Sequence, residues 1–209
     1  MANRSFLCAT DMRTIHPSFV EKPYDSDQQT VATDVYCVPL LWTALFRPDD
    51  IVCHTFEAEG QQVYTEAPLA ERSKVLAQLE NAIPWFNELF RREGALDEYG
   101  AFLKQAIDAV SYKYLTIELQ EIAGMSDEQQ YYDSFRRALG SIGNPMDKTT
   151  KGLFVKIAQF RKLKQFPPAR LLLDGLETSK DEDFWNHCRV CGAGVDNGGI
   201  GRPVPWETG

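Results

Sequence analysis

The spacing of hydrophobic residues changes once near the middle of this chain, and that change constrains the fold most. Between residues 67 and 110, apolar side chains recur at the three- and four-residue intervals of a helix. Residues 112–122 then bring together β-branched and aromatic side chains, including Thr116 and Ile117, which is typical of a strand. A chain with both periods must build helices and a sheet. We therefore predict an α+β fold.

Turn, capping and proline signals divide the chain further. A strand is predicted at 4–10, and a β-hairpin is predicted around Glu59-Gly60. Pro84 should end one helix and open the next, because proline lacks the amide proton and clashes with the preceding turn. Ser126 is expected to cap a helix that begins with acidic residues. The helices are expected at 35–46, 67–83, 84–94, 96–110, 126–140 and 150–165.

These elements predict one helix-rich domain over residues 1–209, with a small, mainly antiparallel sheet. Residues 192–209 are rich in Gly and Pro and are expected to form a loop or tail. The sequence does not indicate an oligomeric state.

The overall charge narrows the possible partners. The net charge is −8 and the pI is about 5.0, which disfavours nonspecific binding to nucleic acid or to anionic membranes. The longest apolar run, Val38 to Phe46, is too short to span a bilayer, and the opening residues lack the apolar core of a signal peptide. We expect a cytoplasmic protein with no membrane contact. All five cysteines are expected to be free thiols.

The segment HCRVCG, from His187 to Gly192, is the strongest chemical motif in the chain. Two cysteines separated by two residues can hold one Zn²⁺, but a closed structural site needs four ligands and usually a second pair. No second pair exists here. A redox role would place the motif at a helix start after a strand, and this one precedes a Gly-rich stretch. Cys188 and Cys191 are therefore only weak metal candidates, and two thiols in a turn is the favoured interpretation.

No catalytic motif or cofactor fingerprint is present, so we predict no catalytic residue and no cofactor. Cys53 and His54 are neighbours in a predicted strand and should point to opposite faces, which excludes a local dyad. An enzyme whose site residues are scattered along the chain, without a motif, stays an open alternative. So does a small zinc-binding regulator that uses His187, Cys188 and Cys191.

Charged residues are unevenly distributed. Residues 136–170 contain nine Lys and Arg residues and one acid, Asp147. This segment could face phosphate or nucleic acid, but a solvated helix surface attracted to the protein's own acids is favoured, because the chain as a whole is acidic. The acidic remainder is the better recognition surface. Its candidate partner-binding residues are Glu118, Glu121, Asp127 and Glu128.

The opening MANRSFLC resembles a family of small uncharacterised bacterial proteins that begin MANRSYLY, with Phe6 and Cys8 where Tyr is usual. Residues 35–46 are similar to that family's apolar helix, and Leu115 to Ile122 is similar to its later strand with acidic residues. The resemblance implies a bacterial, cytoplasmic origin and supplies no catalytic residue, because the family has no established activity.

Size, acidity and the lack of a catalytic motif favour a non-catalytic binding protein. We expect an immunity protein that occludes the active site of a cognate bacterial toxin with an acidic face. Its expected partner is a basic toxin domain.

Overall fold

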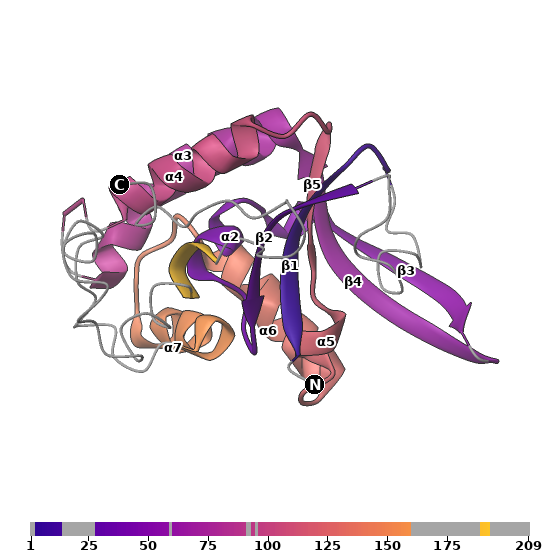
Figure 1. The fold of residues 1–209 in the computed structure, drawn as a ribbon. Coiled ribbons are helices and arrows are strands. Elements are labelled where there is room, and N and C mark those ends of the chain that lie inside the picture. Colours follow the sequence, from indigo (N-terminus) through magenta and orange to yellow (C-terminus); the bar gives the residue numbers. More distant parts are fainter. Residues whose placement is uncertain are drawn as a thin grey trace, which may run out of the picture.

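The computed structural model describes residues 3–13, 28–58, 60–90, 93–94, 96–159 and 189–192. The chain forms both helices and an antiparallel sheet, which confirms the predicted α+β class (Figure 1). The elements are β1 (Arg4–Thr10), β2 (Gln28–Val35), α2 (Leu40–Ala44), the 3-10 helix η1 (Pro48–Asp50), β3 (Ile51–Ala58), β4 (Gln61–Glu71), α3 (Arg72–Phe90), α4 (Asp97–Asp108), β5 (Tyr114–Glu118), α5 (Gln120–Ala123), α6 (Glu128–Ser141) and α7 (Lys148–Ala158).

The sheet has the strand order β2-β1-β5-β4-β3, and every strand pair in it is antiparallel, as predicted. The pairing of β4 with β5 covers only Leu69, Ala70 and Glu71 of β4. The rest of β4 pairs with β3 alone, so the β3–β4 hairpin extends away from the body of the protein (Figure 1). We call this projecting part, residues 51–68, the hairpin arm.

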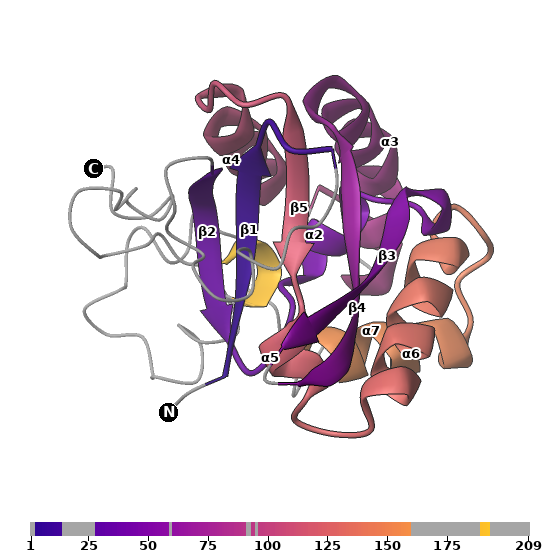
Figure 2. The ribbon, with the colours of Figure 1, turned by 90° about the vertical axis from the view of Figure 1, so that its right-hand side faces the viewer.

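The core lies between the sheet and the helices. Leu7 and Ala9 of β1 face the helices and belong to the main hydrophobic core, while Phe6 and Cys8 alternate with them and form a separate small cluster. With the sheet toward the viewer, α3 and α4 lie behind it (Figure 2). Among the described residues, no helix is both long and apolar enough to cross a membrane.

Pro84 does not divide α3, so this part of the prediction is wrong: the helix runs unbroken from Arg72 to Phe90. A proline inside a helix costs about 3 kcal/mol. The residues that follow it offset that cost, because Phe86 is fully buried and the Trp85 indole N–H donates to the carbonyl of Asn144 at 2.6 Å. Each buried aromatic side chain contributes about 2–3 kcal/mol.

Two strand boundaries also differ from prediction. β2 covers residues 28–35, where no strand was predicted, and the helix predicted at 35–46 is confined to α2 at 40–44. The polar sequence of β2 is held by its pairing with β1, including a hydrogen bond from the Thr33 hydroxyl to the carbonyl of Ser5 at 3.1 Å. β4 likewise takes residues 67–71 from the predicted helix, because pairing with β5 outweighs their helical spacing.

The last helices begin and end at different residues from those predicted. Asp127, not Ser126, caps α6, since its carboxylate accepts from the N–H of Gln130 at 2.8 Å. α7 ends at Ala158, where Gln159 takes a left-handed conformation with φ of 51°. Apart from Gly192, the predicted tail at 192–209 lies outside the described residues. The single-domain prediction for 1–209 stays a prediction.

Candidate functional site

The second half of the HCRVCG motif is packed into the core. Val190 and Cys191 are buried, and the carbonyl of Cys191 accepts a hydrogen bond from the Trp42 indole N–H at 3.0 Å. Gly192 follows with φ of +82°. The visible role of this turn is to cover Trp42 of α2.

The structure describes only part of the candidate metal ligands. His187 and Cys188 lie outside the described residues, whereas the Cys191 Sγ lies 3.6 Å from the carbonyl of Gly192. Within the described ranges, no three His, Cys, Asp or Glu side chains are grouped to hold a metal ion. Cys8, Cys37 and Cys53 are free thiols. The zinc alternative therefore stays a prediction that depends on Cys188.

The four predicted partner-binding acids lie close together in sequence, from the end of β5 to the start of α6. Each accepts a hydrogen bond, three of them from residues nearby in the sequence and one from Arg4 of β1. Glu118 accepts from the N–H of Gln120 at 2.6 Å, and Glu121 accepts from the N–H of Arg4 at 2.8 Å. Asp127 caps α6, and Glu128 accepts from the Tyr132 hydroxyl at 3.2 Å. These bonds hold the carboxylates in defined positions.

Glu118 differs from the other three because it is buried, with 8% of its surface exposed. Burial raises its pKa to about 7, the negative charge of Glu121 adds to the rise, and the N–H of Gln120 opposes it. Near neutral pH the Glu118 carboxyl is therefore partly protonated and lies below the surface. Glu121, Asp127 and Glu128 are exposed.

An exposed apolar side chain lies between these acids in the sequence. Met125 has 45% of its surface exposed and lies in the loop between α5 and α6. Residues 114–135 contain five acids and no Lys or Arg. We call the surface formed by Glu121, Met125, Asp127 and Glu128 the acidic face.

A second acid-only segment lies beside the first, and sequence reasoning did not single it out. Residues 48–71, which include the hairpin arm, contain six acids and no Lys or Arg. The arm contacts α6: the rings of Tyr64 and Tyr132 meet edge to face at 6.4 Å, and Glu66 pairs with Arg136 at 2.6 Å. Since the whole chain has a net charge of −8, residues outside these two segments carry a net +3. By sequence, the excess negative charge is therefore concentrated in these two segments, although Asp50, Glu66 and Glu71 pair with Lys74, Arg136 and Lys113.

Arg136, the first residue of the basic segment 136–170, contacts the hairpin arm. Its guanidinium neutralises Glu66, a carboxylate that is only 3% exposed. This contact agrees with the interpretation that the basic segment is attracted to the protein's own acids. Lys148 and Lys151 lie on α7, while residues 160–170, including Lys162, lie outside the described residues.

Three polar side chains of the arm, Tyr64, Glu66 and Cys53, also contact one another. The Tyr64 hydroxyl donates to Glu66 and lies 3.4 Å from the Sγ of Cys53. Cys53 first and Glu66 second raise the pKa of Tyr64 above its usual range. A hydroxyl has one proton and the carboxylate is the stronger acceptor, so the proton of Tyr64 lies toward Glu66.

Replacing Tyr132 with Phe is expected to destabilise the protein by about 1–2 kcal/mol, because its hydroxyl links α6 to the arm. That hydroxyl donates to Glu128 and interacts with Thr65 and with the N–H of Glu66. Urea unfolding measures the loss.

The neighbouring Tyr131 provides the control for this experiment. Its hydroxyl is buried without a hydrogen-bond partner among the described residues. Tyr131→Phe should therefore be neutral or stabilising. An equal loss for both variants would show that the Tyr132 hydroxyl does not connect the arm to α6.

Comparison with models of protein families, with curated proteins and with solved structures finds no match in any of the three. The resemblance of the opening residues to the MANRSYLY family thus stays a prediction.

Proposed function

We propose that this chain is a non-catalytic binding protein that covers a basic surface of another protein with its acidic face. The observation that carries the proposal is the exposed Met125 in the same segment as the exposed acids Glu121, Asp127 and Glu128, since residues 114–135 contain no Lys or Arg. Protein–protein interfaces combine an apolar centre with a polar rim, and Met is enriched in them.

The hydrogen bonds of these acids support binding. Glu121 and Asp127 are held by backbone N–H groups, and Glu128 is held by Tyr132. Side chains that are already ordered lose less conformational entropy when a partner binds. Concentrated negative charge also accelerates the approach of a basic partner.

Within this proposal, the chain acts as an immunity protein in the bacterial cytoplasm. The partner would be a basic toxin domain whose cleft normally holds nucleic acid or a nucleotide. The acidic face would occupy that cleft and exclude its substrate.

The test is co-expression with the product of the adjacent gene, scoring growth rescue and co-purification. Wild-type protein is expected to rescue growth and form a stable complex. The double variant Glu121→Lys/Glu128→Lys should bind at least ~100-fold more weakly, because each substitution places like charges across the interface. Glu88→Lys is the matched control, since Glu88 is an exposed acid on α3, outside the acidic face.

Two results would oppose the proposal. Absence of both rescue and a complex would remove the adjacent gene product as the partner and the toxin assignment with it. A double variant that rescues and binds as well as Glu88→Lys would show that the acidic face is not the interface.

A further inference from the structure

The outer edge of the hairpin arm is an unusually regular sheet edge. β3 lies at the end of the strand order, and among the described strands it pairs only with β4. Eight consecutive residue pairs, from Ile51↔Pro68 to Ala58↔Gln61, run without a register shift. At the opposite edge of the sheet, the pairing of β2 with β1 shifts register between Leu7 and Cys8.

The register shows which amides of β3 point outward. Ala58 and Gln61 close a two-residue loop in which Gly60 has φ of +77°. A pair that closes such a loop is a hydrogen-bonded pair, and bonded and non-bonded pairs then alternate along an antiparallel ladder. The N–H groups of Cys53, Thr55 and Glu57 therefore point away from β4.

The other edge of the arm supports this assignment. By the same alternation, Glu66 and Pro68 of β4 should direct their backbone nitrogens away from β3. Pro68 has no amide proton to offer, and the N–H of Glu66 interacts with the Tyr132 hydroxyl. The β4 edge is thus blocked or partnered at these positions, while no described strand pairs with the outer edge of β3.

β3 also lacks the usual protection of an edge strand. Natural edges carry Lys, Pro or bulges that prevent pairing with another chain. The sequence of β3, IVCHTFEA, has no Lys and no Pro. Tyr64 and Glu66 connect the arm to α6, and an added strand would supply further hydrogen bonds along β3.

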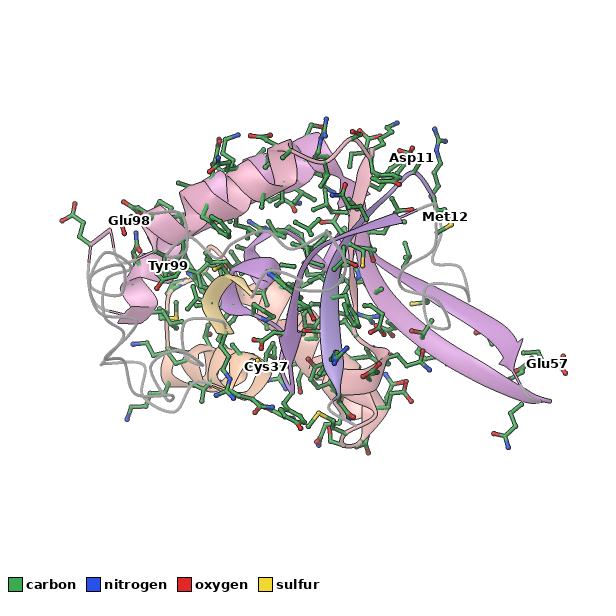
Figure 3. The ribbon with its side chains drawn as sticks, viewed as in Figure 1. Asp11, Met12, Cys37, Glu57, Glu98 and Tyr99 are labelled. Carbon is green, nitrogen blue, oxygen red and sulfur yellow. The ribbon has the colours of Figure 1, made fainter. Side chains whose placement is uncertain are left out.

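The negative charge of the arm determines which kind of strand could pair with the β3 edge. Glu57 is exposed on β3, its labelled side chain lies near the end of the arm (Figure 3), and residues 48–71 contain no Lys or Arg. A second copy of the arm would bring a second acid-only segment alongside the first, whereas a basic strand would neutralise it. We propose that the β3 edge binds an extended, Lys- or Arg-containing segment of the partner as an added strand. This inference rests on the proposed function and specifies how its partner is held.

The first experiment uses the labelled peptide KVKVKVKV, with fluorescence anisotropy to measure binding and amide hydrogen exchange to locate it. Binding is expected to slow exchange at Cys53, Thr55 and Glu57 at least ~10-fold. The same peptide with alternate amides N-methylated should bind at least ~10-fold more weakly, because it cannot complete the ladder. Equal binding of both peptides, no binding, or no protection of these amides would overturn the proposal.

The second experiment blocks the edge itself. Thr55→Pro removes an outward N–H that the hairpin does not use, and Thr55→Val retains it. The Pro variant should lose at least ~10-fold in affinity for the peptide and for the adjacent gene product, and the Val variant should not. Should Thr55→Pro fail to fold, the exchange measurement on the wild-type protein decides.

Two outcomes would distinguish strand addition from binding by the acidic face alone and from pairing with a second copy of the chain. If Glu121→Lys/Glu128→Lys abolishes binding of the gene product while Thr55→Pro binds it normally, the acidic face is correct and strand addition is wrong. Light scattering that reports a dimer, with the β3 amides protected in the free protein, would assign the edge to a second copy and overturn the proposal.

Discussion

Replacing Gly192 with Ala is expected to lower the free energy of unfolding by about 2–4 kcal/mol. Two effects combine. Gly192 has φ of +82°, a region that costs a residue with a Cβ about 1 kcal/mol or more. The added Cβ would also lie 2.6 Å from Cζ2 of Trp42 and 3.2 Å from Cβ of Ala32. Trp42 is fully buried and cannot move away freely, so overpacking adds about 1–3 kcal/mol.

Gly143→Ala separates the two effects. Gly143 has a similar φ of +89°, but a Cβ there would meet nothing within 4 Å. It should therefore show the backbone cost alone, about 1 kcal/mol. Urea unfolding of both variants measures the difference. Equal losses would mean that residue 192 does not pack closely against Trp42.

Replacing Glu118 with Gln is expected to stabilise the protein by about 2–3 kcal/mol at pH 8 and to have little effect at pH 4. Burial raises the pKa of Glu118 from 4.5 to about 7 in the folded protein. Between these values the folded state binds more protons than the unfolded state, so the stability of the wild-type protein falls as pH rises through this window. Gln keeps an acceptor for the N–H of Gln120 and carries no charge.

Glu121→Gln is the control, because Glu121 is exposed and accepts from the backbone N–H of Arg4. It should change stability by much less at pH 8. Chemical unfolding at pH 4, 6 and 8 measures both variants. A Glu118→Gln protein less stable than wild type at pH 8 would show that the charged carboxylate is favourable where it lies.

Local signals in the sequence predicted several elements well. The hairpin signal before Gly60, the β-branched residues of β5 and the acidic start of α6 each act within a few residues, and the β3–β4 hairpin, β5 and α6 are present in the structure. The errors at Pro84 and β2 have a different origin. α3 continues through Pro84 because distant residues such as Asn144 contact the residues that follow it, and β2 forms because β1 pairs with it.

The same distinction applies to the candidate site. Glu121, Asp127 and Glu128 could be selected from their density in one segment. Their proximity to the hairpin arm could not, because it depends on Tyr64 meeting Tyr132 and on Glu66 meeting Arg136 across about 70 residues of chain. The absence of Lys and Arg from 48–71 was visible in the sequence and would have indicated the second acidic segment.

The contact between Trp42 and Cys191 also constrains the order of folding during synthesis. The two residues are separated by 149 positions, so α2 leaves the ribosome long before its covering turn exists. Until residues 189–192 emerge, the Trp42 indole lacks both its acceptor and the glycine packed against its ring. A nascent chain therefore exposes part of the core around α2 until residues 189–192 have been synthesised, and the contacts of Trp42 are completed only then.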